Sequence, residues 1–489
     1  MSSFLASFPG AGVFWLLALP AGATLLLAMV PNWRIAAGLN TLASLLTFLA
    51  ALSLLVVRPE TGPYVLADDL NIIFLLLNGF VAFTTAIYSA TYVANEVANG
   101  RLSPRRVRLY HAMFQMLVFS MNLGLVSNNL GVMWVAIELA TLSTVLMVGL
   151  YRTPEAIEAA WKYFMLGSVG IALALFGTIL VYMAAQPVVG EGQDGMVWSV
   201  LITHVAQFDP ALLNLAFVFL LLGYGTKAAL SPLNAWLPDA HAEGPTPISA
   251  VLSGLLLNVA LYAVLRFKML MDANAGAMAP GPLLMAMGLL SLLLSGVMLY
   301  RRHDIKRLFG YSSIEHMGIM VFAFGIGGPL ANFAGLLHMA MHTLTKSAIF
   351  FAVGHITQAK GTQKIADIRG LTTSHPLLGW GLVAGVLAIA GMPPAGVFMS
   401  EFLLVTSTFS APGPMALLAL PLVLGVLLAF GALMVKLSAM AFGEPNGEST
   451  PVKVSALPML VHLALVFIAG LYLPAAVVRW FQQVAGMLG

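Results

Sequence analysis

Long apolar runs, separated by short polar segments, recur along almost the whole chain. Each run is about 18 to 25 residues long, which is enough for a helix to cross a hydrocarbon core of roughly 30 Å. The alternating apolar and polar positions that a membrane barrel needs are absent, so helices are the expected spanning elements. The pattern predicts an all-α polytopic membrane protein with about fourteen transmembrane helices. The expected spans are 11–30, 35–57, 70–93, 110–126, 129–150, 161–185, 211–232, 245–270, 279–300, 306–325, 329–357, 375–405, 414–440 and 454–478.

The polar segments between these runs are short, and the longest one, around 186–210, carries Gly and Asp residues. We therefore expect a single membrane domain over 1–489, without an extramembrane domain. Its expected parts are peripheral helices 1–3 in 1–109, a five-helix repeat in 110–272, a second five-helix repeat in 279–440 and a last helix in 441–489.

Composition narrows the class further. Of the 489 residues, 60% are hydrophobic and only 8% are charged, as expected of an integral membrane protein. Cysteine is absent, which excludes iron–sulfur clusters, thiolate zinc sites and disulfides. We expect no cofactor in this chain, so electron transfer coupled to it must take place in another subunit. The net charge of +3 comes from the loops and gives no support to nucleic-acid binding.

Charge in the loops predicts the orientation of the chain. Loops placed alternately on two sides put most basic residues on one side, which the positive-inside rule makes cytoplasmic. These residues are Arg101, Arg105, Arg106, Arg108, Arg301, Arg302, Lys306, Arg307, Lys360, Lys364 and Arg369. The opposite side receives mainly acidic residues, with Arg266 and Lys268 as exceptions. We expect a bacterial cytoplasmic (inner) membrane protein with both termini in the periplasm.

Four ionisable residues lie within stretches that otherwise read as membrane spans: Glu138, Lys227, Lys306 and Glu401. An isolated charge at membrane depth costs several kcal/mol, so each is expected to face the protein interior, a partner charge or water. This set of two acids and two bases favours ion movement. A static charge pair that holds helices together is the alternative for Glu138 and Lys227, and snorkelling to the interface is the alternative for Lys306.

The order of these charges suggests two related halves. An acid then a lysine occur in the first half, and a lysine then an acid in the second. Pro232 and Pro238 follow Lys227, and the segment GMPP at 391–394 precedes Glu401, so the helix that carries each residue is expected to be interrupted. Broken helices at matching positions of two inverted repeats indicate the ion pathway in many transporters.

A row of titratable residues lies in the second half. His338, His342 and Lys346 follow each other at intervals of four, which places their side chains on one helical face. Such a row can pass protons through intervening water. Histidines held by interior hydrogen bonds without any transport remain an alternative. A metal site is disfavoured, because no HExxH glutamate or third nearby carboxylate completes a ligand set.

The motifs together carry a family resemblance. The segments WVAIELATL, GTKAALSPLNAWLPDAHAEGPTPISA, DIKRLFGYSSIEHMG, LHMAMHTLTKSAIF and AGMPPAGVFMSEF occur in this order. They resemble the antiporter-like proton-translocating subunits shared by respiratory complex I, Mrp-type cation/proton antiporters and membrane-bound nickel–iron hydrogenases. The resemblance covers about 110–440. AWLPDAHAE, LLLN, SSIEHMG and EAAWKYF are most similar to component F of hydrogenase-4 and formate-hydrogenlyase complexes.

The resemblance implies a role for each matching residue. It implies that Glu138 on the fifth helix and Lys227 on the broken seventh helix form a pair that gates a half channel. His338, His342 and Lys346 match the central relay of the eleventh helix. The remaining matches are Lys306 on the tenth helix, Glu401 on the twelfth, and Asp239 and His241 after the seventh.

One departure from the family pattern concerns the eighth helix. Many members carry a lysine or histidine there, whereas this chain offers Ser253 and Asn258. Neither side chain titrates near neutral pH, so a relay must bridge this position with water or be altered.

The implied function is proton translocation within a redox-driven complex of the hydrogenase-4 or formate-hydrogenlyase type. The expected partners are other membrane subunits, a peripheral redox arm and the lipid bilayer, with protons or Na⁺ as the ion. One alternative is a subunit of a cation/proton antiporter or an inorganic-carbon uptake complex. A second is a structural membrane subunit that conducts no ions.

Overall fold

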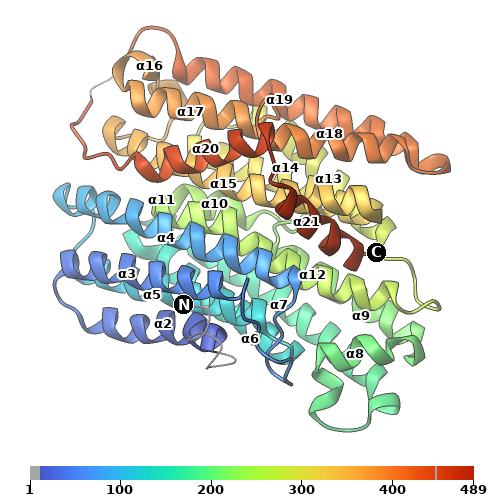
Figure 1. Ribbon diagram of the computed structural model, residues 1–489. Coiled ribbons are helices and arrows are strands. Elements are labelled where there is room, and N and C mark those ends of the chain that lie inside the picture. The colour runs from blue at the N-terminus through green and yellow to red at the C-terminus, as the bar shows by residue number, and fades with distance from the viewer. Residues whose placement is uncertain (1–10, 447–448) are drawn as a thin grey trace.

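The chain folds into a bundle of helices that run side by side and are joined by loops at the two ends of the bundle (Figure 1). The computed structural model describes residues 11–446 and 449–489, so the N-terminus that was predicted to be periplasmic lies outside the described residues. Within the described part no strand forms, and only three isolated β-bridges link loops. The prediction of an all-α polytopic protein is confirmed.

The first half contains α2 (Ala11–Met29), α3 (Trp33–Ser53), α4 (Asp69–Ala98), α5 (Pro104–Val126), α6 (Leu130–Val148), α7 (Pro154–Val189), α8 (Trp198–His204), α9 (Pro210–Lys227), α10 (Trp236–Glu243), α11 (Thr246–Val251) and α12 (Leu257–Asp272). The second half contains α13 (Gly281–Tyr300), α14 (Ile305–Ile326), α15 (Gly328–Lys360), α16 (Leu371–Ser374), α17 (Pro376–Ile389), α18 (Gly396–Phe409), α19 (Ala419–Ala441), α20 (Leu457–Leu471) and α21 (Ala475–Met487). Short 3₁₀ turns lie at Gly149–Tyr151, Gln193–Met196, Val205–Gln207, Ile365–Asp367 and Gly413–Leu418, and a π-helical turn lies at Leu252–Leu256.

Capping residues in the loops set where several helices begin. Asn129 accepts backbone hydrogen bonds at the start of α6, and Asp304 does so for α14. Asp68 forms a full capping box with Asn71 at the start of α4. These side chains satisfy amide groups that a helix leaves without internal partners. The short polar segments of the sequence are thus helix start signals as well as connections.

Eleven of the described helical segments are long and apolar enough to cross a membrane. The pair α20 and α21 makes a twelfth if it counts as one span. The expectation of about fourteen spans also included α14 and the combined segment of α17 and α18, which fall outside this length and hydropathy criterion.

Both predicted helix interruptions are present. α9 ends at Lys227, and the chain stays irregular until α10 begins at Trp236. In the same way, α17 ends at Ile389 and α18 begins at Gly396. Prolines lack the amide hydrogen that a continuous helix needs, and those in the two gaps account for the breaks. Each break leaves backbone groups free to face side chains of other helices.

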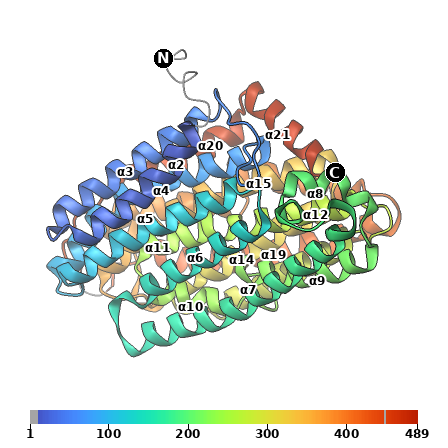
Figure 2. The same ribbon diagram turned by 90° about the horizontal axis from the view of Figure 1, so that it is seen from below.

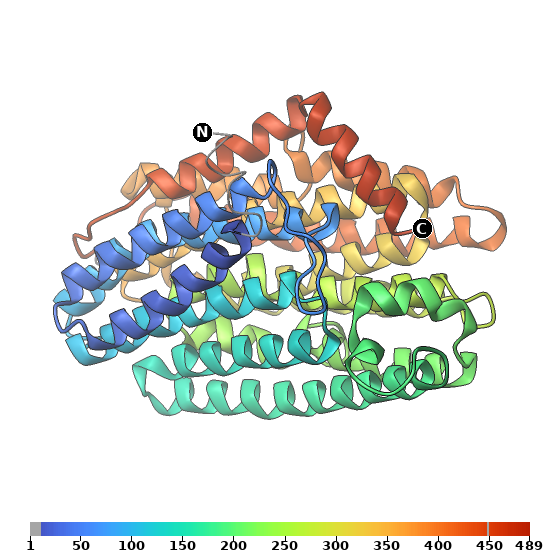
Figure 3. The ribbon, with the colours of Figure 1, turned by 60° about the horizontal axis from the view of Figure 1, so that its bottom comes forward.

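The last predicted span, 454–478, is wrong as a single helix. The chain there forms α20 and α21, which meet at an angle of 82°. Figure 3 shows this bend in the red C-terminal helices. Pro474 caps the start of α21 and disfavours helical geometry in the residue before it. The segment around 186–210 also differs from the expected plain loop, because it contains α8.

Glycines let some helices approach closely. A Cβ added at Gly318 of α14 would lie 2.6 Å from the carbonyl oxygen of Gly288 in α13. Similarly, a Cβ at Gly223 of α9 would lie 2.6 Å from the carbonyl oxygen of Gly170 in α7. Small residues at such positions are the usual means of packing membrane helices.

The most buried elements lie at the centre of the bundle. Every residue in the apolar window of α15, and of the continuous segment Thr246–Asp272, is buried within the protein. By contrast, only a third of the corresponding window of α2 or α19 is buried. Figure 2 shows α2 and α3 along one side of the bundle and α7 and α9 along another. Polar residues on α15 are therefore surrounded by protein.

The loops with many basic residues meet at one end of the bundle. The amide of Ile305 donates to the carbonyl oxygen of Gln363, which joins two of these loops. At the opposite end, the two basic residues that departed from the charge rule have acidic partners. Arg266 lies 2.7 Å from Asp68, and Lys268 lies 2.6 Å from Asp272. Their positive charges are balanced locally, which explains why they depart from the rule.

Candidate functional site

Glu138 and Lys227 form a direct ion pair. The Lys227 Nζ donates to Glu138 Oε2 at 3.0 Å and to the hydroxyl of Thr141 at 2.6 Å. Lys227 is 2% exposed and Glu138 18% exposed. The lysine is the last residue of α9, so the helix break places its charge inside the bundle beside α6. Burial of a lysine at this depth requires such a partner.

Lys306 is buried and does not snorkel to the surface. Its ammonium group donates to the carbonyl oxygens of Ala242 and Gly244. These carbonyls lie at the end of α10 and in the turn before α11. The far end of the first broken helix thus supplies acceptors for a lysine from the second half.

The three predicted relay residues of α15 lie on one buried face, with different surroundings. Lys346 donates to the carbonyl oxygen of Phe309 at 3.0 Å. Both ring nitrogens of His342 lack a hydrogen-bond partner among the described residues. His338 lies between two polar groups, with its Nδ1 2.9 Å from the hydroxyl of Ser400.

A further histidine, His316, lies outside the row predicted from the sequence and joins it in the structure. The Nδ1 of His316 lies 2.9 Å from the Nε2 of His338, and its ring also packs against that of His342 at 5.4 Å between centroids. His316 comes from α14, within the SSIEHMG segment that carried part of the resemblance. Its neighbour Glu315 is buried as well. The motif signalled these residues, but the spacing rule along a single helix did not.

Glu401 lies beside this histidine cluster. One ligand atom each of Glu401, His316 and His338 lie within 4.8 Å of one another. The spacing along α15 could not indicate this set, because the fold takes one histidine from α14, one from α15 and the carboxylate from α18. Two imidazole nitrogens that bind one zinc ion at about 2.0 to 2.1 Å would be separated by roughly 3.3 Å in tetrahedral geometry. The 2.9 Å separation of the histidine nitrogens is instead that of a hydrogen bond.

Ser253 and Asn258 both face polar groups of neighbouring helices. The hydroxyls of Ser253 and Ser313 lie 2.7 Å apart, so either can donate. Asn258 donates to the hydroxyl of Thr343 at 2.7 Å, which in turn donates to the carbonyl oxygen of Gly254. The position that lacks a titratable residue is therefore lined with hydrogen-bonding groups.

Asp239 and His241 lie in different environments, although they are two residues apart. Asp239 forms ion pairs with Lys162 and Arg307, each at 3.3 Å. His241 is fully buried, stacks on Phe350 and has no hydrogen-bond partner among the described residues. Asp239 thus links α7 and α14, whereas His241 points into the core.

The predicted residues separate into distinct groups. One group is the Glu138 and Lys227 pair of the first half, and another is the histidine cluster with Glu401 in the second half. Within the described part of the chain, no hydrogen bond connects the two groups directly. The structure therefore brings together the members of each group. A third set lies on the α10 to α12 segment and contacts α14 or α15, and its members are Ser253, Asn258 and His241.

Known proteins share the sequence and fold of this chain. The family described as NADH:quinone oxidoreductase/Mrp antiporter, TM matches residues 127–427. A hydrogenase-4 component F homolog of Methylacidiphilum infernorum is 61% identical over 464 residues, which cover 95% of this chain and 97% of that protein. An NADH-quinone oxidoreductase subunit N of Desulforudis audaxviator is 27% identical, covering 72% of this chain and 68% of its own length.

Solved structures share the whole fold. A chain of an archaeal membrane-bound sulfane sulfur reductase gives a TM-score of 0.86 at 22% identity and covers 97% of each chain. A chain of the Mrp complex from a Dietzia species gives 0.83 at 17% identity, covering 98% of this chain and 97% of that one. The family match and the 61% identical relative confirm the predicted resemblance. The chain belongs to the NADH:quinone oxidoreductase/Mrp antiporter family and is an antiporter-like membrane subunit of the complex I-related and hydrogenase-4 type.

Proposed function

We propose that the chain conducts protons across a bacterial cytoplasmic membrane as part of a redox-driven, hydrogenase-4-like complex. The observation that carries this proposal is the buried Glu138 and Lys227 ion pair at the end of a broken helix. Ionisable groups at membrane depth are costly and mark ion pathways by default. The name of the 61% identical relative supports the parent complex. The absence of cysteine, which excludes iron–sulfur clusters from this chain, supports redox centres in partner subunits.

The second half supplies groups through which a proton can travel. His316 and His338 share a hydrogen bond, and Glu401 lies next to them. Neutral imidazole accepts a proton at one nitrogen and releases one from the other, so the pair can pass protons without net movement of a side chain. His342, with free ring nitrogens, and Lys346 extend the row toward the first half.

The pair in the first half provides the coupling step. A positive charge that arrives at the relay repels Lys227 and weakens its attraction to Glu138. The lysine is then free to pass its proton onward, and Glu138 loses its counter-ion until the charge leaves. Opening and closing of the 3.0 Å contact would thus alternate with charge in the relay.

Hydroxyl and amide groups bridge the position where related proteins have a titratable residue. Ser253 with Ser313, and Asn258 with Thr343, line this region and can orient water between the two halves. A hydroxyl can donate and accept at once, which suits it to a proton path.

The proposed topology has fourteen spans in an inverted repeat. The α14 helix and the combined α17 and α18 segment complete the twelve apolar candidates. The fourth helix of each five-helix unit is the interrupted one, which supports equivalent positions for Lys227 and Glu401. The end with the basic loops is placed in the cytoplasm and both termini in the periplasm.

The proposal also includes the partners. We place other membrane subunits against the bundle within the bilayer and a peripheral redox arm outside it, with H⁺ as the transported ion. A role in an Mrp-type cation/proton antiporter, with Na⁺ as the second ion, is the competing function. The observation in its favour is the fold that this chain shares with a chain of the Mrp complex.

The test is proton translocation by the intact complex in membrane vesicles. Glu138→Gln and Lys227→Ala should each lower the number of protons moved per redox turnover by at least about tenfold while the complex still assembles. Glu155→Gln is the control, because Glu155 is an exposed acid near the start of α7. Unchanged translocation in both variants would favour a structural subunit, and Na⁺ movement without a redox partner would favour an antiporter.

A further inference from the structure

A polar cavity of about 370 Å³ opens at the end of the bundle where the basic loops meet. It lies between the loop after α4, the turn before α7, the turn before α11, the start of α14 and the end of α15. Every lining residue except Gly361 has a polar side chain. A cavity of this size and polarity holds water.

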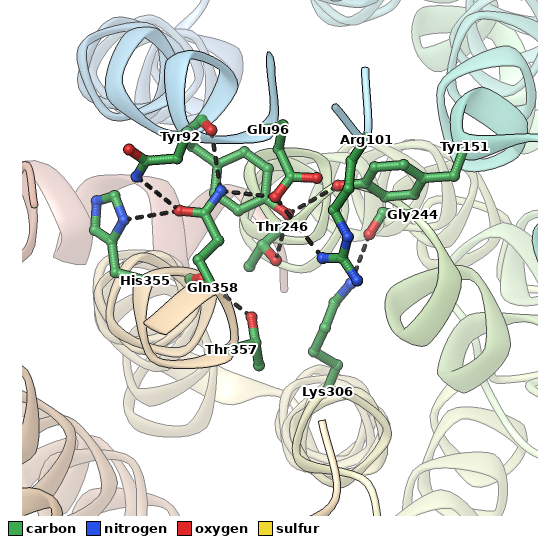
Figure 4. A network of polar contacts seen from close by, with 12 residues as sticks. Tyr92, Glu96, Arg101, Tyr151, Gly244, Thr246, Lys306, His355, Thr357 and Gln358 are labelled. Carbon is green, nitrogen blue, oxygen red and sulfur yellow. Dashed lines mark hydrogen bonds and ion pairs between the residues drawn. The ribbon is translucent and has the colours of Figure 1, made fainter. Parts of the chain in front are cut away.

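Lys306 lies on the wall of this cavity. Its ammonium is held by the carbonyl oxygens of Ala242 and Gly244, and Figure 4 shows it beside Gly244. Thr246 and Thr357 line the cavity nearby. A fixed positive charge at this point repels other cations, so a proton that enters here needs a negative group close by.

Glu243 lines the cavity itself but is paired with Arg307 at 3.4 Å. The second negative group near the cavity is Glu96. It lies near the end of α4 and is fully buried. Its Oε1 accepts from the amide of Gln358 at 2.8 Å, whereas its Oε2 has no partner among the described residues. A buried carboxylate oxygen without a partner is costly, and it leaves a vacant acceptor position beside the cavity. Figure 4 shows the carboxylate directed toward Arg101 and Tyr151, which both line the cavity.

Arg101 lies between Glu96 and the outside. One guanidinium nitrogen is 3.9 Å from Glu96 Oε1, and the side chain of Arg101 is 57% exposed. The contact is long, and an exposed arginine can leave it at little cost when the carboxylate is neutral. The titratable and charged groups around Glu96 are Tyr88, Tyr92, Arg101, Tyr151, Glu243, Lys306 and His355.

We propose that this cavity is the cytoplasmic inlet for protons and that Glu96 is the carboxylate that receives the entering proton. Arg101 contacts Glu96 when the carboxylate is charged and moves away when it is neutral. A hydrated proton enters the cavity and forms an O–H bond with Glu96, leaving water behind. The neutral acid no longer attracts Arg101, which moves toward solvent. Transfer of the proton inward restores the carboxylate, whose negative charge draws Arg101 back. This inference rests on the proposed function and adds the place where protons enter the protein.

The first test asks whether the cavity is open to water, and it is independent of proton pumping. The native chain has no cysteine, so single cysteines report their own surroundings. Thr357→Cys and Thr362→Cys, at two residues that line the cavity, should react in the intact complex with a membrane-impermeant thiol reagent supplied from the basic end only. Ser295→Cys, at a buried residue of α13, should stay unmodified. Protection of both cavity cysteines from either side would overturn the inlet.

The second test asks whether Glu96 receives the proton. Glu96→Gln keeps the shape of the side chain but cannot take up a proton, and should lower proton translocation by about tenfold or more in the assembled complex. Glu96→Asp should recover part of the loss, and Glu155→Gln should cause none. Full translocation in Glu96→Gln, alongside a loss in Glu138→Gln, would overturn the inlet and leave the proposed function standing. No loss in any variant, including Glu138→Gln, would reject both.

Discussion

At the scale of single residues, the site depends on buried charges whose partners come from other helices. Lys227 has a carboxylate partner, whereas Lys306 is held by backbone carbonyls alone. The first arrangement responds to changes in a neighbouring charge, and the second fixes a positive charge in place. Under the proposed function, gating therefore belongs to Lys227 and electrostatic positioning to Lys306.

Removal of one partner of the ion pair should destabilise the protein more than removal of both. Glu138→Gln leaves an uncompensated buried ammonium, which costs about 3 to 5 kcal/mol when a pair is fully buried and less here because Glu138 is partly exposed. The double variant Glu138→Gln with Lys227→Met should recover much of the loss. Thermal unfolding of the purified complex in detergent measures both effects, and additive losses would contradict the expected coupling.

Chelation should leave proton translocation unchanged, because His316 and His338 are hydrogen-bonded to each other. Treatment of the purified complex with EDTA, followed by reconstitution and flux measurement, checks this expectation. The histidine to alanine variants serve as controls for bound metal. A stoichiometric metal that copurifies with the complex and disappears in His316→Ala would show that the cluster is a metal site after all.

At the scale of elements, close packing of helices positions the residues of the proposed relay. The α14 helix carries His316 and Ser313, and its glycine contact with α13 sets how deeply it sits in the bundle. A shift of α14 by a few tenths of an ångström would lengthen the hydrogen bond between His316 and His338. The alignment of these side chains therefore depends on helix packing as well as on the histidines themselves.

Gly318→Ala should destabilise the protein, because the new methyl group would meet the backbone of α13 at 2.6 Å. Such overpacking costs about 1 to 3 kcal/mol. Gly38→Ala is the matched control, because a Cβ at Gly38 meets nothing within 4 Å. A comparison of the two melting temperatures checks the prediction. An equal or higher melting temperature for Gly318→Ala would show that the two helices can separate at little cost.

Most helices and both helix breaks could be predicted from the sequence, but one bend and several contacts between helices could not. Apolar run length located most spans, and the prolines after Lys227 and before Glu401 correctly indicated the breaks. The bend at Pro474 was missed, because its flanking segments are apolar enough to read as one run. His316 and Glu96 were missed because their neighbours come from distant segments, and spacing along one helix reports only local faces.

At the scale of the whole molecule, the distribution of charge separates two ends. The basic loops surround the polar cavity at one end, and the other end carries acidic residues with the paired Arg266 and Lys268. The central helices join the two ends through buried polar residues. The proposed proton path would therefore have a defined direction relative to the membrane.

Orientation can be measured without reference to transport. Thr153→Cys at the basic end should react with an impermeant thiol reagent from the cytoplasmic side, and Glu191→Cys at the opposite end from the periplasmic side. Both residues are exposed, so access is limited only by the membrane. Labelling of both cysteines from the same side would contradict the fourteen-span topology, and exchanged sides would reverse the proposed direction.

The π-helical turn has a consequence for how this part of the chain is compared with others. The amide of Leu257 donates to the carbonyl oxygen of Leu252, five residues earlier. The turn thus contains one residue more than an α-helical turn would use. Relative to an unbroken α-helix, the directions of all later side chains are rotated by about 100°. A helical wheel drawn through 246–272 with a constant step would assign Asn258 to the wrong face. An alignment that matches this segment residue for residue to an unbroken helix would pair side chains that point in different directions.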